Sequence, residues 1–392
     1  MNPADFPTAL RRFADFGTPT VEFEDQGLRY FVNEYWTAGQ RQAHALHEVS
    51  YRACFKPQLP GFFIERLTEP GDTVYDPFSG RGTTALQAAL MGRKPVANDV
   101  NPLSAMLLAP RLAPPALIAL RDRLDEIPAA APPDANEPEL DAFYHPATLN
   151  RLRGLRTWLL GRIPLDTADA WIRMVALNRL TGHSPGFFSV YTLPPNQATS
   201  VVAQRKINAA RNQVPPPRDV AGIILKKTKS LLSDGLPPPH PPSLLMTGPA
   251  SSTPLLADTA VDLLVTSPPF LNVVDYEGDN WLRCWFAGID PSAIRISIHG
   301  GIPAWERFVR ASFEEFARVV RPDGFIGFEV GEVRGGKVLL ERNVVAAIDG
   351  LPFEVLGVMV NQQEFTKTAN CWGVGNNAKG TNTNRIVMIR RC

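Results

Sequence analysis

The sequence predicts an α/β fold in which a parallel-rich β-sheet carries helices on both faces and is interrupted by a large insertion. Short apolar segments alternate with segments of helical periodicity toward both ends of the chain, which is the order of β–α–β units. A glycine-rich turn joins the first of these strands to a helix. The chain has 392 residues, which is too long for one compact core and fits a large sheet domain with an insertion.

The N-terminal part of the predicted sheet contains two strands and one helix. Residues 73–76 (TVYD) form the first strand, after the turn-forming sequence EPGD. Residues 83–91 predict a helix that Gly92 closes, and residues 95–99 (PVAND) predict the next strand.

The C-terminal part predicts five more strands and a helix. Apolar residues recur at nearly helical spacing over residues 308–320, and the turn sequence RPDG follows. The expected strands are residues 244–247, 261–266, 325–330, 353–360 and 385–389. The runs LLMT and VDLLVT among them are apolar enough for buried parallel strands.

Proline-rich stretches mark the boundaries of the insertion. Residues 128–138 read PAAAPPDANEP, and the runs PPP at 215–217 and PPPHPP at 237–242 follow. Proline removes a backbone donor and fixes φ, so such runs interrupt helices and central strands. We expect an N-terminal part over 1–112, an inserted module over 113–242 and a C-terminal part over 243–392.

The net charge of +1 averages two opposed parts. Residues 151–240 contain 13 Lys and Arg against 4 Asp and Glu, whereas the whole chain contains 40 against 39. Such a basic block either binds a polyanion or forms an ordinary solvated face, and composition alone leaves both readings open.

Composition also excludes several classes of protein. No apolar run approaches the length of a membrane-spanning helix. The four cysteines lie far apart without a CxxC pair, so we expect neither a disulfide framework nor a metal site. The N-terminal sequence MNPADFPTALRRF lacks the basic-then-apolar pattern of a secretion signal, and we expect a cytoplasmic, nucleoid-associated protein.

The glycine-rich turn DPFSGRGTT at 76–84 is the first candidate for a binding site. No Lys follows the glycines, which argues against a P-loop. The sequence GRGTTA also fits a dinucleotide-binding turn. The acid that precedes the turn, Asp76, suits a cationic ligand such as S-adenosylmethionine better than a pyrophosphate. The remaining interpretation of this segment is a tight turn that binds no ligand.

The second candidate is TSPPF at 266–270, which follows a predicted strand of the same sheet. Such a turn opens at the same carboxyl edge as the glycine-rich turn. The Ser267 side chain and the Pro268 carbonyl can accept hydrogen bonds from an exocyclic amine, and Phe270 can stack on a planar base. A plain strand-ending turn with Phe270 in the core is the alternative.

Together these segments resemble the motifs of the DNA amino-methyltransferases, which methylate cytosine N4 or adenine N6. Their cofactor motif typically reads DPFxGxGTT and their catalytic motif [DNS]PP[YFW]; here the two read DPFSGRGTT and SPPF. Residues 55–60, 96–102 and 319–324 resemble further segments of that family. The chain departs from the pattern in Arg81, in the order of its motifs, and in the absence of an acid over residues 247–250.

The resemblance implies a seven-stranded Rossmann-like methyltransferase sheet with the insertion as its target-recognition module. It also implies S-adenosylmethionine, base flipping and direct methyl transfer to the amine of a specific DNA site, without a metal. The initial Ser of the tetrapeptide favours cytosine N4, and adenine N6 is the close alternative. An NAD-dependent oxidoreductase and a non-catalytic DNA-binding protein are more distant alternatives.

Three groups of residues follow from these motifs and from the basic block. The catalytic group is Ser267, Pro268, Pro269 and Phe270. The cofactor group is Phe55, Pro57, Asp76, Pro77, Phe78, Gly80, Gly82, Thr83, Thr84, Asp99, Asn101 and Pro102. The DNA-binding group is Arg173, Arg179, Arg205, Lys206, Arg211, Lys226 and Lys227. DNA is the expected partner, and a second copy of the chain and a cognate restriction endonuclease are further candidates; no membrane partner is expected.

Overall fold

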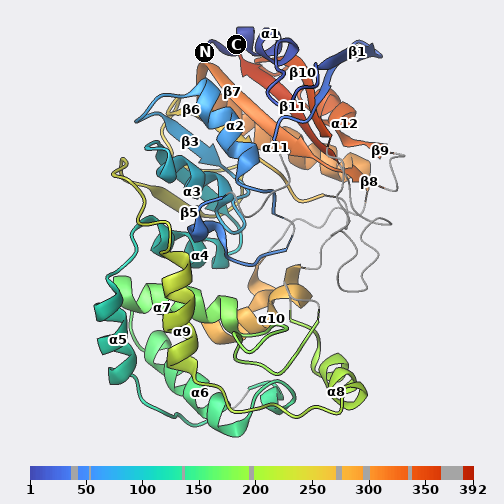
Figure 1. The fold of residues 1–392 in the computed structure, drawn as a ribbon. Coiled ribbons are helices and arrows are strands. Elements are labelled where there is room, and N and C mark those ends of the chain that lie inside the picture. The colour runs from blue at the N-terminus through green and yellow to red at the C-terminus, as the bar shows by residue number, and fades with distance from the viewer. Residues whose placement is uncertain are drawn as a thin grey trace.

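The protein is described by a computed structural model that covers all residues except 37–42, 53, 135–136, 194–197, 271–275, 295–300, 334–337 and 363–382. Its centre is one sheet with the strand order β1-β2-β10-β11-β7-β6-β3-β4-β5 (Figure 1). The strands are β1 (Val21–Asp25), β2 (Leu28–Asn33), β3 (Thr73–Asp76), β4 (Lys94–Asp99), β5 (Leu244–Thr247), β6 (Val261–Thr266), β7 (Val320–Val330), β10 (Phe353–Gln362) and β11 (Thr383–Arg391).

The predicted α/β fold with a mostly parallel sheet is confirmed. Strands β5, β4, β3, β6 and β7 run parallel to one another, whereas β11 lies antiparallel between β7 and β10. Their carboxyl ends therefore meet at one edge, where open α/β sheets bind their ligands.

The expected number of seven strands is wrong, because the described sheet has nine. The two additional strands form an N-terminal hairpin, β1–β2, whose second strand pairs in parallel with β10. Every residue of β1 is exposed, so its sequence VEFED lacks the apolar run that marks a buried strand. Residues 321–324, which were expected to form a turn before the strand, instead belong to β7. They form a local irregularity in the pairing of β7 with β6.

Helices cover both faces of the sheet, as strand alternation requires. The neighbouring residues Val74 and Tyr75 of β3 point into opposite cores, one with Phe63 and the other with Phe313. The helices of the first face are α1 (Phe6–Arg11), α2 (Gln58–Leu67) and α3 (Thr83–Leu90), and those of the second are α11 (Ile302–Val319) and α12 (Leu340–Ala347). Helix α4 (Leu103–Leu112) follows β4, and a separate small sheet pairs β8 (Glu332–Val333) with β9 (Val338–Leu339).

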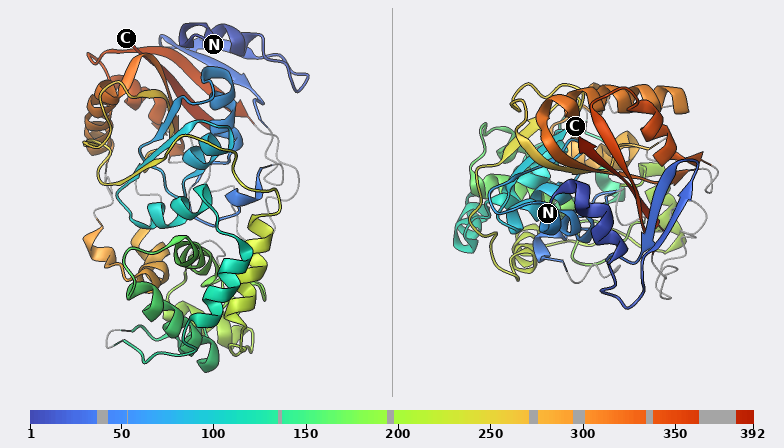
Figure 2. Two further views of the ribbon diagram at one scale, coloured as in Figure 1. Left: turned by 90° about the vertical axis from the view of Figure 1, so that its left-hand side faces the viewer. Right: turned by 90° about the horizontal axis from the view of Figure 1, so that it is seen from above.

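Helices also make up a module that lies at the end of the molecule opposite the two termini (Figures 1 and 2). Its helices from the chain between α4 and β5 are α5 (Leu117–Glu126), α6 (Pro146–Leu160), α7 (Thr167–Arg179), α8 (Val201–Ala210) and α9 (Val220–Leu231). Helix α10 (Tyr276–Ala287), which comes after the sequence SPPF, packs against α7, α6 and α4. The module is therefore built from two separate stretches of chain.

Within the described residues, no helix combines the length and the apolar character needed to cross a bilayer.

Candidate active site

The glycine-rich turn between β3 and α3 requires glycine at two positions. Gly80 and Gly82 have φ values of 53° and 81°, a region that side chains with a Cβ rarely adopt. A Cβ at Gly82 would also lie 2.7 Å from Cδ1 of Leu108. The turn therefore brings its backbone close to α4.

Asp76 ends β3 at the start of this turn and is 1% exposed. Its Oδ1 accepts hydrogen bonds from the Thr266 hydroxyl at 2.6 Å and from the backbone N–H of Phe78 at 3.1 Å. Its Oδ2 is buried without a hydrogen-bond partner in the described structure. Burial raises the pKa of this carboxyl to about 7, against the opposing effect of the hydrogen bonds from Thr266 and Phe78. A buried acceptor of this kind is suited to a cationic ligand.

Asp99 ends β4 beside the same turn. Its two oxygens accept from the backbone N–H groups of Gly80, at 2.7 Å, and Asn101, at 2.9 Å. Desolvation raises the pKa of its carboxyl to about 6, although the residue keeps part of its surface exposed. Asn101 in turn accepts from the N–H of Leu103, and Pro102 is the residue before α4. The predicted residues at the end of β4 thus form one connected turn.

The upstream segment that contains Phe55 and Pro57 lies against the glycine-rich turn through Arg81. The Arg81 guanidinium donates to the carbonyls of Val49, at 2.9 Å, and Phe55, at 3.3 Å. Pro57 is buried immediately before α2. Arg81, an unusual residue for the motif, is 6% exposed, so it fastens this segment to the turn rather than pointing into solvent.

The other predicted cofactor residues hold the turn from inside. The Thr84 hydroxyl donates to the Val265 carbonyl of β6 at 3.1 Å, and the Thr83 hydroxyl accepts from Arg81. The Pro77 carbonyl accepts from the Asn98 side chain. The ring of Phe78, with its centroid 5.4 Å from that of Phe308, joins the turn to α11.

The tetrapeptide Ser267–Phe270 begins where β6 ends, next to the glycine-rich turn. Thr266 is 0% exposed, and its hydroxyl bonds to Asp76 as described above. The two motifs are 190 positions apart in the chain, yet they meet at one carboxyl edge through this hydrogen bond. Phe270 is partly buried against the core of the second sheet face.

Two residues that sequence reasoning missed contact this tetrapeptide from β7 and from α11. The Glu329 carboxylate accepts from the Ser267 hydroxyl and from the Asn384 side chain, and burial raises its pKa against these hydrogen bonds. Trp305 donates from Nε1 to the Pro269 carbonyl at 2.9 Å. An isolated acid in the apolar strand FIGFEV was an available signal for Glu329, but nothing in the sequence relates Trp305 to this turn.

Four of the seven predicted DNA-binding cations are exposed. Lys206, Arg211 and Lys226 are exposed and form no ion pair within the described part of the chain; Arg211 also lies 3.8 Å from the ring centre of Tyr191. Arg205 is exposed but paired with Glu139 and Asp141.

The remaining three cations of that prediction are less available. Lys227 pairs with Glu48 at 3.0 Å. Burial lowers the pKa of Arg173, and it lowers that of Arg179 to about 10. The Arg179 guanidinium lies over the ring of Phe187, 4.1 Å from its centre.

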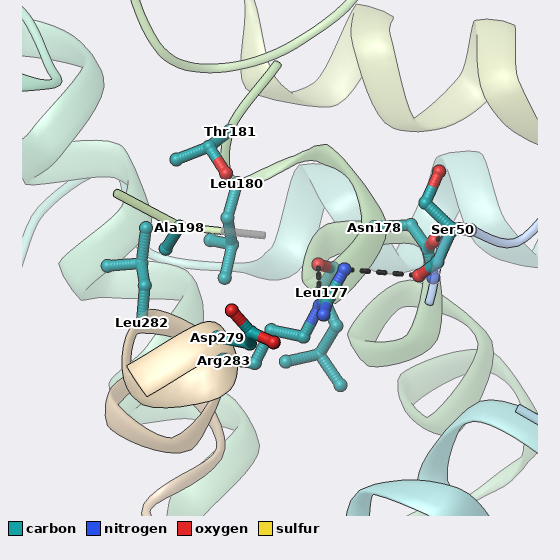
Figure 3. A pocket seen from close by; sticks show the side chains of 9 residues that line it. All are labelled: Ser50, Leu177, Asn178, Leu180, Thr181, Ala198, Asp279, Leu282 and Arg283. Carbon is teal, nitrogen blue, oxygen red and sulfur yellow. Dashed lines mark hydrogen bonds between the residues drawn. The ribbon is translucent and has the colours of Figure 1, made fainter. Parts of the chain in front are cut away.

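A small pocket lies at the junction between the module and the sheet domain, apart from both motifs (Figure 3). Arg283 of α10 crosses it and donates to the carbonyls of Ser50 and Leu177. The Asn178 side chain accepts from the Ser50 N–H at 2.7 Å. None of its lining residues belongs to the predicted groups, so we regard it as a packing feature of the junction. The described residues contain no group of three or more His, Cys, Asp or Glu side chains arranged for a metal.

Comparison with known proteins finds a family match in the part of the chain that contains the glycine-rich turn. Residues 24–105 match the N6/N4 family whose description is DNA methylase. The chain is 33% identical over 72 residues to the Type II methyltransferase M.MjaII of Methanocaldococcus jannaschii. That match covers 18% of this chain and 13% of the relative, so the chain spans only a small part of the relative's length.

Two solved methyltransferase structures show a weak overall likeness. The rRNA methyltransferase aviRa from Streptomyces viridochromogenes has a TM-score of 0.34 at 12% identity, over 90% of each chain. An S-adenosylmethionine-dependent methyltransferase from Methanosarcina mazei has a TM-score of 0.34 at 10% identity, over 84% of this chain and 96% of that one.

Proposed function

We propose that this chain is a DNA amino-methyltransferase. It would transfer the methyl group of S-adenosylmethionine to an exocyclic amine of a flipped DNA base, with cytosine N4 as the favoured target. One observation carries this proposal. The Thr266–Asp76 hydrogen bond of 2.6 Å joins the cofactor turn to the catalytic turn at one edge of the sheet. A methyl donor and an acceptor amine bound at these two turns would therefore be neighbours, which direct transfer requires.

The residues of the glycine-rich turn fit S-adenosylmethionine. The unpartnered Oδ2 of Asp76 offers a buried acceptor for a ligand that carries ammonium and sulfonium charges. The glycines let the backbone approach the ligand without a Cβ in the way. Asp99 ends the neighbouring strand, where an acid accepts from ribose hydroxyls. When bound, the cofactor would supply an electrophilic methyl group: the N–C bond would form as the S–C bond breaks, S-adenosylhomocysteine would leave, and the amine would release one proton.

Ser267 and Glu329 act on the amine in this proposal. An exocyclic amine is a weak nucleophile because its lone pair is conjugated with the ring. The Ser267 proton is committed to the Glu329 carboxylate, so the Ser267 oxygen is left as an acceptor for one N–H of the amine. With the Pro268 carbonyl accepting the second N–H, the nitrogen lone pair is directed out of the ring plane and toward the methyl group.

Phe270 supplies an aromatic face on which the flipped base can stack. The ring is partly buried against the core of the second sheet face and lies close to the backbone of Gly331, where an added Cβ would come within 2.9 Å of Phe270 Cε2.

Radiolabelled methyl transfer to unmodified DNA tests the proposal. The enzyme is incubated with S-adenosylmethionine carrying a labelled methyl group, and the nucleosides of the digested product are identified by mass spectrometry. N4-methylcytosine is the expected product, and N6-methyladenine would replace the favoured target by its alternative. Ser267→Ala and Phe270→Ala should abolish transfer while the cofactor still binds.

Calorimetry with S-adenosylmethionine and with NAD separates this activity from the oxidoreductase alternative. Binding of NAD alone would overturn the cofactor assignment. Binding of S-adenosylmethionine without label in any DNA, from a genomic mixture that samples all short sites, would overturn the assignment of DNA as substrate.

A further inference from the structure

The two prolines of the catalytic turn cannot donate backbone hydrogen bonds that would fix the turn. Pro268 and Pro269 have no N–H, and their carbonyls need donors from elsewhere in the structure. For Pro269 that donor is Nε1 of Trp305, at 2.9 Å. Trp305 lies in the first turn of α11, so a helix from another part of the chain reaches the turn.

Trp305 is itself fixed by packing. It is 0% exposed and belongs to the core that α11 forms on the second face of the sheet, together with Val309 and Phe313. A buried Trp ring with a single N–H normally places that donor on a partner. Because the ring cannot turn without opening this core, the direction of its N–H is determined by the fold.

The Pro269 carbonyl controls the direction of the carbonyl before it. Each peptide unit is planar, and the ring of Pro269 fixes its φ. Only one torsion, ψ of Pro269, therefore remains free between the peptide that carries the Pro268 carbonyl and the peptide that carries the Pro269 carbonyl. Once Trp305 holds the second carbonyl, this torsion is fixed as well.

The structure assigns Trp305 as the positioning residue of the catalytic turn: its indole N–H, through the Pro269 carbonyl, directs the Pro268 carbonyl toward the target amine. The assignment rests on the proposed function. Trp305 does not touch the amine, and its contribution is the orientation of a group that does. Removing the N–H should therefore impair the chemical step and leave cofactor binding intact.

Trp305→Phe removes the donor and keeps most of the ring. We expect kcat for methyl transfer to fall about 10- to 100-fold, the size of effect that follows when a reacting group is displaced by up to an ångström. The dissociation constant for S-adenosylmethionine should change less than twofold.

Trp171→Phe is the matched control. Trp171 is also 0% exposed and donates from Nε1 at 2.9 Å, to the Thr228 hydroxyl inside the helical module. It should lose a similar amount of thermal stability and keep its kcat. Equal losses of kcat in both variants would reduce the role of Trp305 to stability and overturn the inference.

Crystal structures of the two variants give a readout that does not depend on activity. The Ser267–Phe270 turn should shift in Trp305→Phe and superimpose on the native turn in Trp171→Phe. An unmoved turn in Trp305→Phe, or a moved turn with unchanged kcat, overturns the inference. If the native protein methylates no DNA, the proposed function fails, whereas the position of the turn still decides whether Trp305 orients it.

A second variant covers the case in which Trp305→Phe does not fold. Benzothienylalanine at position 305 has the shape of Trp with sulfur in place of the N–H, so it removes the donor alone. The same shift of the turn and the same loss of kcat are expected, and a native turn with native kcat would overturn the inference.

Discussion

The carboxyl edge of the sheet and the helical module both contain charged residues, but they use them differently. At the sheet edge, Asp76 and Glu329 are buried, and side chains from other strands bond to them. In the module, Arg153 pairs with Glu137 and Arg205 pairs with Glu139, on or near the surface. A buried charge whose hydrogen bonds are incomplete is suited to binding a ligand. The two charges of a surface ion pair, in contrast, mostly neutralise each other.

The surface of the module is less basic than the composition of residues 151–240 suggests. Residues 151–240 are strongly basic, but the preceding residues 113–150 contain seven acids against two basic residues. Several of these acids fold back onto the basic helices, since Asp134 pairs with Arg156 and Glu137 with Arg153. The basic surface available to DNA is therefore smaller than the count suggests.

Asp76→Asn should have the largest effect on the sheet edge. The substitution keeps the shape and the acceptor for Thr266 but removes the buried negative charge. Loss of one partner from a buried charge pair costs about 2–5 kcal/mol, so affinity for S-adenosylmethionine, measured by calorimetry, should fall by about 30-fold or more.

Asp262→Asn is the control for this change. Asp262 lies near the opposite end of β6, where it accepts from the N–H of Thr73 and pairs with Arg321. Its loss should leave the affinity unchanged. Native affinity in Asp76→Asn would remove Asp76 from the cofactor site.

Glu329→Gln should have the second-largest effect, on the chemical step of methyl transfer. The amide keeps its size but lacks the charge that holds the Ser267 proton. We expect kcat to fall about 10- to 100-fold with little change in cofactor affinity.

Glu315→Gln provides the comparison for Glu329. Glu315 accepts from the Thr253 hydroxyl at 2.6 Å, which is the same chemistry outside the site. It should lose stability only, and an equal loss of kcat in both variants would contradict the role of Glu329.

The raised pKa of Asp76 predicts a pH dependence. A cationic ligand binds the ionised carboxylate, so affinity should rise about fivefold between pH 6 and pH 7, as the pH approaches the pKa of about 7. Over this range the ammonium of the cofactor keeps its proton. Calorimetry on Asp76→Asn should show a much shallower profile, with at most about a twofold rise left from Asp99, whose carboxyl pKa is about 6. A slope equal to that of the native protein would assign the dependence to another group.

The same group makes a prediction for the free protein. The unfolded chain loses this proton near the ordinary aspartate pKa of 3.8, at lower pH than the folded chain does. Asp76 therefore lowers the free energy of unfolding as pH rises from 3.8 to about 7, and its cost is constant above that. Asp76→Asn should gain most over the native protein at pH 8, as measured by denaturant unfolding.

The smallest effects are expected in the module. Lys206→Gln and Arg211→Gln each remove an exposed cation without an ion pair. Each should weaken DNA binding a few-fold and reduce the slope of log affinity against log salt by about 1. Arg153→Gln, whose guanidinium pairs with Glu137 at 2.6 Å, should change neither quantity, and equal slopes in all three variants would place the DNA elsewhere.

Much of the sheet could be predicted from local sequence. The strand over residues 73–76 and the helix that starts at Thr83 lie as expected, because short apolar runs and glycine turns are local signals. The hairpin β1–β2 was missed because its exposed first strand has no apolar run. Helix α10 follows the catalytic motif in sequence but packs into the module, which no local pattern indicates.

The sequence by itself determined the two motifs, the glycines at positive φ and the prolines that end β6, since each depends on the chemistry of a few adjacent residues. Only the tertiary structure decided that Thr266 bonds to Asp76, that Glu329 and Trp305 contact the Ser267–Phe270 turn, and which cations of the module are already paired. These contacts join residues from 16 to 190 positions apart. Their partners are set by the packing of strands and helices, and a linear pattern carries no record of that packing.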